Sequence, residues 1–143
     1  MFKLIAIVAV LAFSSSTDLQ DYFPKRYCST PTTGSLLKPR VRHDITFWNM
    51  TDVSYARYDF FCFGLWWRRR RGFSHATYEY LPEEKTVKIF TDDVDDKFFF
   101  NKDDFTRIKY YNESDELVMQ HNGYVLGFQA CLGEWDADIE ESY

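Results

Sequence analysis

The chain alternates between short apolar segments and short polar clusters. The segments are rich in Phe, Tyr, Trp, Val and Ile, and acidic and turn-forming residues separate them. Aromatic and β-branched residues favour strands, and segments about ten residues apart with short turns are typical of an antiparallel meander. The sequence therefore predicts an all-β domain, with strands near 44–49, 53–63, 73–81, 86–91, 97–100, 105–111, 116–120 and 123–131.

Alternation within the segments indicates how the strands are buried. Around Ile108 the apolar positions 108 and 110 alternate with the charged Arg107 and Lys109, which is typical of half-buried antiparallel strands. Asn122-Gly123 between two apolar runs is a strong hairpin signal. A meander of about eight strands can hide its edges by closing into an up-and-down barrel. We therefore expect a barrel, with a two-sheet β-sandwich as the alternative.

The N-terminus has the layout of a secretory signal peptide. Lys3 precedes ten uninterrupted apolar residues, Leu4 to Phe13, and three serines follow. A membrane span needs about 20 apolar residues, so a cleaved signal at 1–16 is the better interpretation. We expect a secreted, extracellular product without a membrane span.

The remaining chain is long enough for one domain. Residues 17–43 are polar and contain three prolines, which predicts an irregular N-terminal lead-in. The barrel-like domain is expected over 44–135, and an acidic C-terminal tail over 136–143.

Two tripeptides match the acceptor pattern for N-glycosylation. They are Asn49-Met50-Thr51 and Asn112-Glu113-Ser114. In an exported chain both asparagines are candidates for a glycan.

Three cysteines, Cys28, Cys62 and Cys131, follow the predicted signal. In an oxidising compartment two of them should form a disulfide. We favour Cys62–Cys131, because both lie in strand-like segments that can be neighbours. Cys28 lies in a stretch rich in Ser, Thr and Pro and could equally reach Cys131.

Charge is unevenly distributed along the chain. Residues 22–71 hold ten Lys and Arg against three Asp, whereas residues 72–143 hold six against seventeen Asp and Glu. The basic part contains the run Arg68, Arg69, Arg70 and Arg71. We interpret the run as an exposed loop between two strands; the alternatives are binding of an anionic glycan or lipid head group and cleavage by a processing protease. The net charge of −5 argues against a nucleic acid partner.

The sequence carries no catalytic or metal-binding signature. The three histidines, His43, His75 and His121, lack the spacing of a zinc site. The acidic cluster at 92–96 lacks the Gly and Glu positions of a calcium loop, and there is no phosphate loop or nucleophile elbow. We therefore predict no enzyme, no metal and no cofactor.

A local pattern resembles a known family. Gly64-Leu65-Trp66-Trp67, with the basic run and the segment 76–89 behind it, is similar to the first motif of the lipocalins and the hairpin that follows it. The resemblance implies an eight-stranded, lipocalin-like barrel with a ligand cavity, and it gives Trp66 a structural role in packing across the closed end. Nearly fifty residues of the mature chain precede the motif, so strands before Gly64 would have to belong to the barrel. An immunoglobulin-type domain fits less well, because Gln129 stands where the tyrosine corner requires Tyr.

Two functions follow as expectations. The first is a secreted binding protein that holds a small apolar ligand in an aromatic-lined β cavity; the sequence does not identify the ligand-binding residues. The second is an extracellular protein-interaction module, of an immune- or host-modulating type, that uses the Arg68–Arg71 loop or an exposed aromatic patch. A ligand binder needs a cavity of about 300 Å³ or more, whereas an interaction module does not.

Overall fold

A computed structural model describes residues 18–30, 40–63, 65–92, 94, 101–121 and 123–131, and between 61 and 69 it describes the backbone but not the side chains. The predicted signal peptide at 1–16, the segment at 97–100 and the tail at 136–143 lie outside the described residues. None of the helices in the described part has the length and apolar character needed to cross a bilayer.

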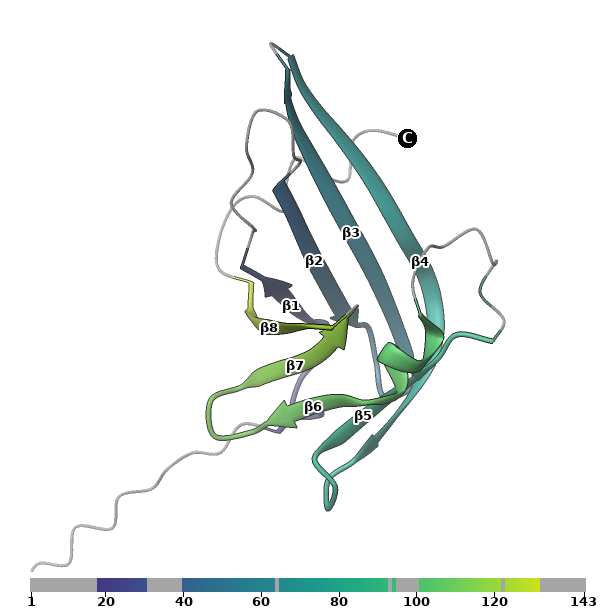
Figure 1. Ribbon diagram of the computed structural model, residues 1–143. Coiled ribbons are helices and arrows are strands. Elements are labelled where there is room, and N and C mark those ends of the chain that lie inside the picture. Colours follow the sequence, from purple (N-terminus) through teal and green to yellow (C-terminus); the bar gives the residue numbers. More distant parts are fainter. Residues whose placement is uncertain are drawn as a thin grey trace, which may run out of the picture.

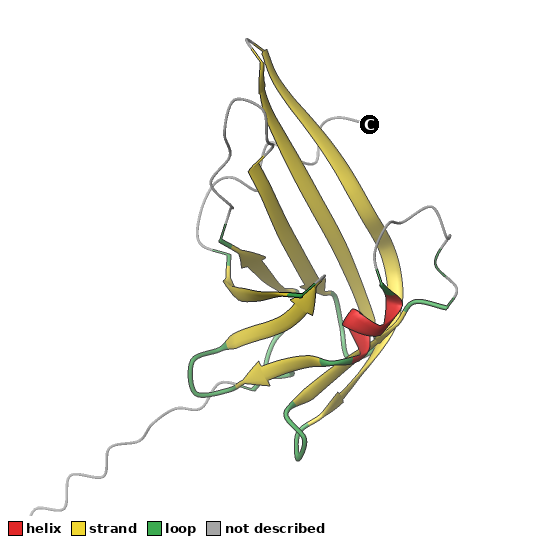
Figure 2. Cartoon of the chain, in the orientation of Figure 1, coloured by secondary structure: helices red, strands yellow, loops and turns green. Residues whose placement is uncertain are grey.

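Within these residues the strands form a closed antiparallel barrel, in which each strand pairs with its neighbours in the chain and β8 returns to β1 (Figure 1). The strands are β1 (Lys25–Ser29), β2 (Arg40–Phe47), β3 (Asp52–Phe63), β4 (Leu65–Leu81), β5 (Thr86–Phe90), β6 (Ile108–Tyr111), β7 (Glu116–His121) and β8 (Tyr124–Ala130), and the 3₁₀ helix η1 (Lys102–Thr106) lies between β5 and β6 (Figure 2). The predicted all-β meander and its closure into a barrel are confirmed.

The predicted lead-in at 17–43 is wrong in part, because it contains β1 and the beginning of β2. The barrel therefore starts at Lys25 rather than at residue 44. In β1 the buried positions are Lys25, Tyr27 and Ser29. Two of these three residues are polar, so the alternation did not look like that of a half-buried strand.

The predicted strand at 105–111 begins later than expected. Asn101 caps η1, since its side chain accepts a hydrogen bond from the backbone N–H of Asp103. The helix carries Phe105 into the core, and β6 starts only at Ile108. The sequence signal that was missed is the Asx cap ahead of the apolar run.

β3 and β4 form a long hairpin that projects beyond the other strands at one end of the barrel (Figure 1). The pairing runs from Asp52 opposite Thr77 to Phe63 opposite Leu65, with an irregularity at Val53 and Tyr55. Near this irregularity the two backbones approach each other closely at Gly72, where an added Cβ would clash with the carbonyl of Tyr55. Only glycine fits this position without displacing a strand.

The core lies inside the barrel and is dominated by aromatic side chains. Phe47 and Tyr78 pack edge to face with ring centroids 4.8 Å apart, and Tyr27 packs against Phe47 at 6.0 Å. Leu19, from the segment that precedes β1, belongs to the same core and is fully buried. The N-terminal segment thus packs across the end of the barrel at which β1 begins.

Candidate functional site

A buried ion pair lies at the end of the barrel where β1 begins. Lys25 Nζ lies 2.9 Å from Asp115 Oδ1, and the lysine side chain is 2% exposed. The same carboxylate oxygen accepts hydrogen bonds from the hydroxyls of Tyr27, at 2.7 Å, and Tyr110, at 2.9 Å. Lys25 also donates to the carbonyl of Asp18 at 3.3 Å, which links the pair to the N-terminal segment.

The electrostatics of this cluster match its geometry. Burial alone would raise the pKa of Asp115, but the hydrogen bonds from Tyr27, Lys25 and Tyr110 outweigh it and hold the pKa below the usual value. Burial and the bond to Asp115 raise the pKa of Tyr27, so this phenol keeps the proton that it donates. The cluster joins the core to the N-terminal segment at this end of the barrel.

A second polar cluster lies farther along the interior, toward the projecting hairpin. His43, on β2, is 5% exposed, and its Nδ1 lies 2.7 Å from the Tyr55 hydroxyl. Its ring meets the ring of His121 edge to face at 5.7 Å. His121 in turn approaches Asp104, with 3.1 Å between Nδ1 and Oδ2.

Burial sets the protonation states in this cluster. Burial, together with the nearby His121 and Arg57, lowers the pKa of His43 to about 4, although Asp59 acts in the opposite direction. His43 is therefore neutral at pH 7. Burial also raises the pKa of Tyr55, so the His43–Tyr55 contact joins two uncharged groups.

Among the side chains that the structure describes, Arg57 and Arg71 share the inner face with His43. Arg57 of β3 lies opposite His43 of β2, and on its other side it lies opposite Arg71 of β4. Side chains at directly opposite positions of neighbouring antiparallel strands point to the same face. Arg57 Nε lies 2.9 Å from Oδ1 of Asp59, which is also on this face and is 4% exposed.

A triangle of aromatic rings lies beside these charged groups. The ring of Tyr55 lies 5.7 Å from that of Phe73 and 5.0 Å from that of Phe105, and Phe73 and Phe105 are 5.6 Å apart. Phe73 follows Arg71 by two residues on β4 and lies opposite Tyr55. This end of the interior therefore combines an apolar surface with hydrogen-bonding and charged groups.

The prediction that Arg68–Arg71 form a loop is wrong, because all four residues belong to β4 and pair with Arg57 to Phe60 of β3. Alternation in a strand sends neighbouring side chains to opposite faces. Arg70 is exposed, whereas Arg71 is half-buried on the inner face. The run therefore does not present four cations on one surface.

The preferred disulfide Cys62–Cys131 is also wrong. Cys131 is bonded to Cys28, the alternative partner, with 5.2 Å between the Cα atoms. β1 pairs with β8 so that Cys28 lies opposite Gln129, and the chain leaving β8 stays close, since Cys131 N–H donates to the Arg26 carbonyl at 3.1 Å. The pairing was missed because β1 was not recognised as a strand.

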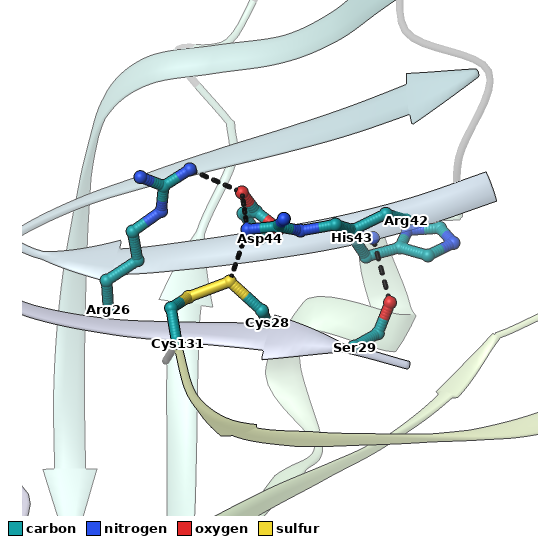
Figure 3. A network of polar contacts seen from close by, with 7 residues as sticks. All are labelled: Arg26, Cys28, Ser29, Arg42, His43, Asp44 and Cys131. Carbon is teal, nitrogen blue, oxygen red and sulfur yellow. Dashed lines mark hydrogen bonds and ion pairs between the residues drawn. A yellow bond between two sulfur atoms is a disulfide. The ribbon is translucent and has the colours of Figure 1, made fainter. Parts of the chain in front are cut away.

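A charged network surrounds this disulfide on the outer face of β1 and β2 (Figure 3). Asp44 is 3% exposed and accepts from Arg26 at 2.6 Å and from Arg42 at 2.7 Å. Arg42 also donates to Cys28 Sγ at 2.7 Å. The network ties β1 to β2 and covers the outward-facing carboxylate.

The other candidates are dispersed over the molecule. Asn49 is exposed between β2 and β3, and its side chain accepts from the backbone N–H groups of Thr51 and Asp52 at 2.9 Å each. Asn112 lies in the turn between β6 and β7. The backbone of Trp66 lies opposite Cys62 near the tip of the projecting hairpin, and its side chain is outside the described ones. Glycosylation and the structural role of Trp66 stay predictions.

Comparison with known proteins provides no relative: no family model, no curated protein and no solved structure matches the chain. In the described part of the chain, no group of three or more His, Cys, Asp or Glu side chains could hold a metal ion. The inner-face cluster was not foreseen from the sequence. The sequence pattern that could have predicted it is the alternation Tyr55-x-Arg57-x-Asp59, because alternate residues of a strand point to the same face.

Proposed function

We propose that this protein is an extracellular binding protein that takes a small, largely apolar ligand into the barrel end lined by His43, Arg57 and Arg71. A single observation carries the proposal: on the inner face of the barrel, the rings of Tyr55, Phe73 and Phe105 lie beside a group of polar and charged side chains. Ligand sites typically have this composition, with apolar walls for affinity and a few polar groups for orientation.

The two ends of the interior differ in a way that favours this location. At the β1 end, Lys25 and Asp115 satisfy each other and are joined to the N-terminal segment. At the other end, the side chain of Arg57 is 32% exposed although it points into the barrel. A ligand can approach the interior from this side, where a charged group on the inner face reaches solvent.

Export is supported by three independent features. The Cys28–Cys131 disulfide is typical of oxidising compartments. The signal-like segment at 1–16 and the two glycosylation patterns have the same implication.

Titration with the neutral fluorescent probe N-phenyl-1-naphthylamine tests the proposal. We expect saturable binding of one probe per chain, with NMR shift changes at His43, Tyr55 and Phe105 and none at Lys25 or Asp115. Absence of saturation, or shift changes confined to the outer surface, would contradict it.

A second candidate function, protein interaction, has one specific observation in its favour. Tyr124 and Val125 are adjacent at the start of β8 and are 74% and 69% exposed. Exposed apolar neighbours of this kind can mark an interaction surface. In that case Tyr124→Ser and Val125→Ser would weaken binding of the protein to cell surfaces and leave probe binding unchanged.

A further inference from the structure

We propose that the ligand is an uncharged molecule with a hydroxyl group, which forms a hydrogen bond with Nε2 of His43 while the apolar part of the ligand lies against the neighbouring aromatic rings. This inference rests on the proposed function, because it names the ligand class of the same site.

The first argument is that the ring of His43 is held in place but uses only one of its two nitrogens. The backbone N–H of His43 donates to the Ser29 hydroxyl at 2.8 Å, and Nδ1 lies 2.7 Å from the Tyr55 hydroxyl. Nε2 makes no hydrogen bond within the described part of the chain. The ring therefore offers a ligand one polar atom in a fixed position.

The second argument is that this nitrogen can be reached. His43 is 5% exposed, but Nε2 is not one of the described side-chain atoms that are fully enclosed without a partner, so it keeps some accessible surface. Arg57, directly opposite on β3, has a side chain that is 32% exposed. A purely apolar molecule lying over Nε2 would remove it from water and leave it unpaired, which is unfavourable. The ligand therefore needs a polar group at this point.

The chemistry of the imidazole favours a hydroxyl as this group. In a neutral histidine one ring nitrogen donates and the other accepts, and the hydrogen bond at one nitrogen sets the role of the other. A hydroxyl both donates and accepts. It can therefore pair with Nε2 whichever way the proton is shared between His43 and Tyr55.

The surroundings of the ring favour a ligand without charge. Burial keeps His43 neutral and keeps the proton on Tyr55. Arg57 and Asp59 act on His43 in opposite directions, and they form an ion pair with 2.9 Å between Nε and Oδ1. The ring of Phe128, which is fully buried, lies 6.5 Å from that of His43. A charged group placed here would lose its hydration, for which one hydrogen bond to a neutral nitrogen does not compensate.

The test compares 2-naphthylmethanol with 2-ethylnaphthalene, in which a methyl group replaces the hydroxyl, by fluorescence titration of the full chain. We expect His43→Phe to lower the ratio of the alcohol affinity to the hydrocarbon affinity on the order of tenfold, equivalent to about 1.4 kcal/mol. Binding of 2-ethylnaphthalene by the variant shows that it is folded. His75→Phe is the matched control and should keep the wild-type ratio, because the side chain of His75 is 77% exposed.

A second measurement uses the wild-type protein and does not depend on a variant that folds. In nitrogen NMR of the histidine rings, 2-naphthylmethanol should shift the Nε2 signal of His43, whereas 2-ethylnaphthalene should shift it much less. The anion 2-naphthoate tests the charge of the ligand and should bind more weakly than the alcohol.

Each outcome has a definite meaning. An equal affinity ratio in wild type and His43→Phe, an Nε2 signal that the alcohol does not shift, or tighter binding of 2-naphthoate than of the alcohol would overturn the inference and leave the proposed function standing. Failure of all three probes to bind would overturn the two together.

Discussion

The hydroxyl of Tyr55 lies 2.7 Å from Nδ1 of His43, inside a barrel that leaves the histidine 5% exposed. Both residues face inward from neighbouring strands, and burial keeps His43 in its uncharged form beside the positively charged Arg57. The protein thereby keeps a titratable group neutral at the boundary between its aromatic core and its charged inner face.

This arrangement predicts acid sensitivity. The pKa of His43 is lowered to about 4 in the folded protein, whereas an unfolded histidine titrates near 6.5. The unfolded state therefore binds the proton more readily, so stability is full above about pH 6.5 and falls as the pH drops to about 4. The loss attributable to His43 is on the order of 3 kcal/mol, and urea unfolding between pH 7 and pH 4 measures it.

His43→Gln should flatten this pH dependence. His75 provides the control, since its side chain is 77% exposed and His75→Gln should leave the profile as in wild type. An equally steep profile in His43→Gln would show that the acid sensitivity arises elsewhere.

The buried ion pair between Lys25 and Asp115 predicts a large stability effect. Asp115→Asn leaves the buried ammonium of Lys25 without its counter-charge and weakens the acceptor for two phenols. Breaking a buried pair in this way lowers the free energy of unfolding by about 3–5 kcal/mol. The lower figure is expected here, because Asp115 is 21% exposed and water partly screens the charge. Chemical denaturation should show this loss, whereas Glu113→Gln, an exposed change in the same turn, should stay within about 0.5 kcal/mol.

The close approach of β3 and β4 predicts that Gly72→Ala is destabilising. The added Cβ would clash with the Tyr55 carbonyl and the Ala56 Cα, so the hairpin must open locally. A clear decrease in the thermal unfolding midpoint is expected. Gly127→Ala is the matched control, because a Cβ at Gly127 has no neighbour within 4 Å; equal midpoints for the two variants would contradict the close approach.

The cysteines provide a fourth prediction. Peptide mapping of non-reduced protein should find Cys28 linked to Cys131, with Cys62 available to an alkylating reagent after denaturation. Cys131→Ser should cost about 2–5 kcal/mol, as removal of a native disulfide does in small secreted domains. Recovery of a peptide that links Cys62 to Cys131 would contradict the structure.

The sequence predicted the β class, the meander and the closed barrel because these depend on features that are local in the chain. The Asn122-Gly123 signal and the alternation around Ile108 each act over a few residues. The site was harder to predict, since it depends on register. Arg57 and Arg71 are fourteen positions apart in the sequence and become neighbours only because β3 and β4 pair with this particular offset.

The errors had the same origin. β1 places Lys25 and Ser29 inside the barrel, which is unusual for a strand; Asp115 supplies the counter-charge for Lys25, and the backbone N–H of residue 43 on β2 donates to the Ser29 hydroxyl. These partners come from distant parts of the chain, so the local composition of residues 25–29 does not indicate that they are present. Without β1, the correct partner of Cys131 could not be distinguished from Cys62.

The Cys28–Cys131 bond joins the first strand of the barrel to the last. The barrel wall is therefore a covalent macrocycle, closed by peptide bonds along the chain and by one sulfur–sulfur bond at the seam, where β1 meets β8. A protease that cut after Arg71 would only linearise this ring at a new point, because both products would still be connected through the seam. Release of a fragment requires two separate chemical events, hydrolysis of the backbone and reduction of the disulfide, and neither is sufficient alone.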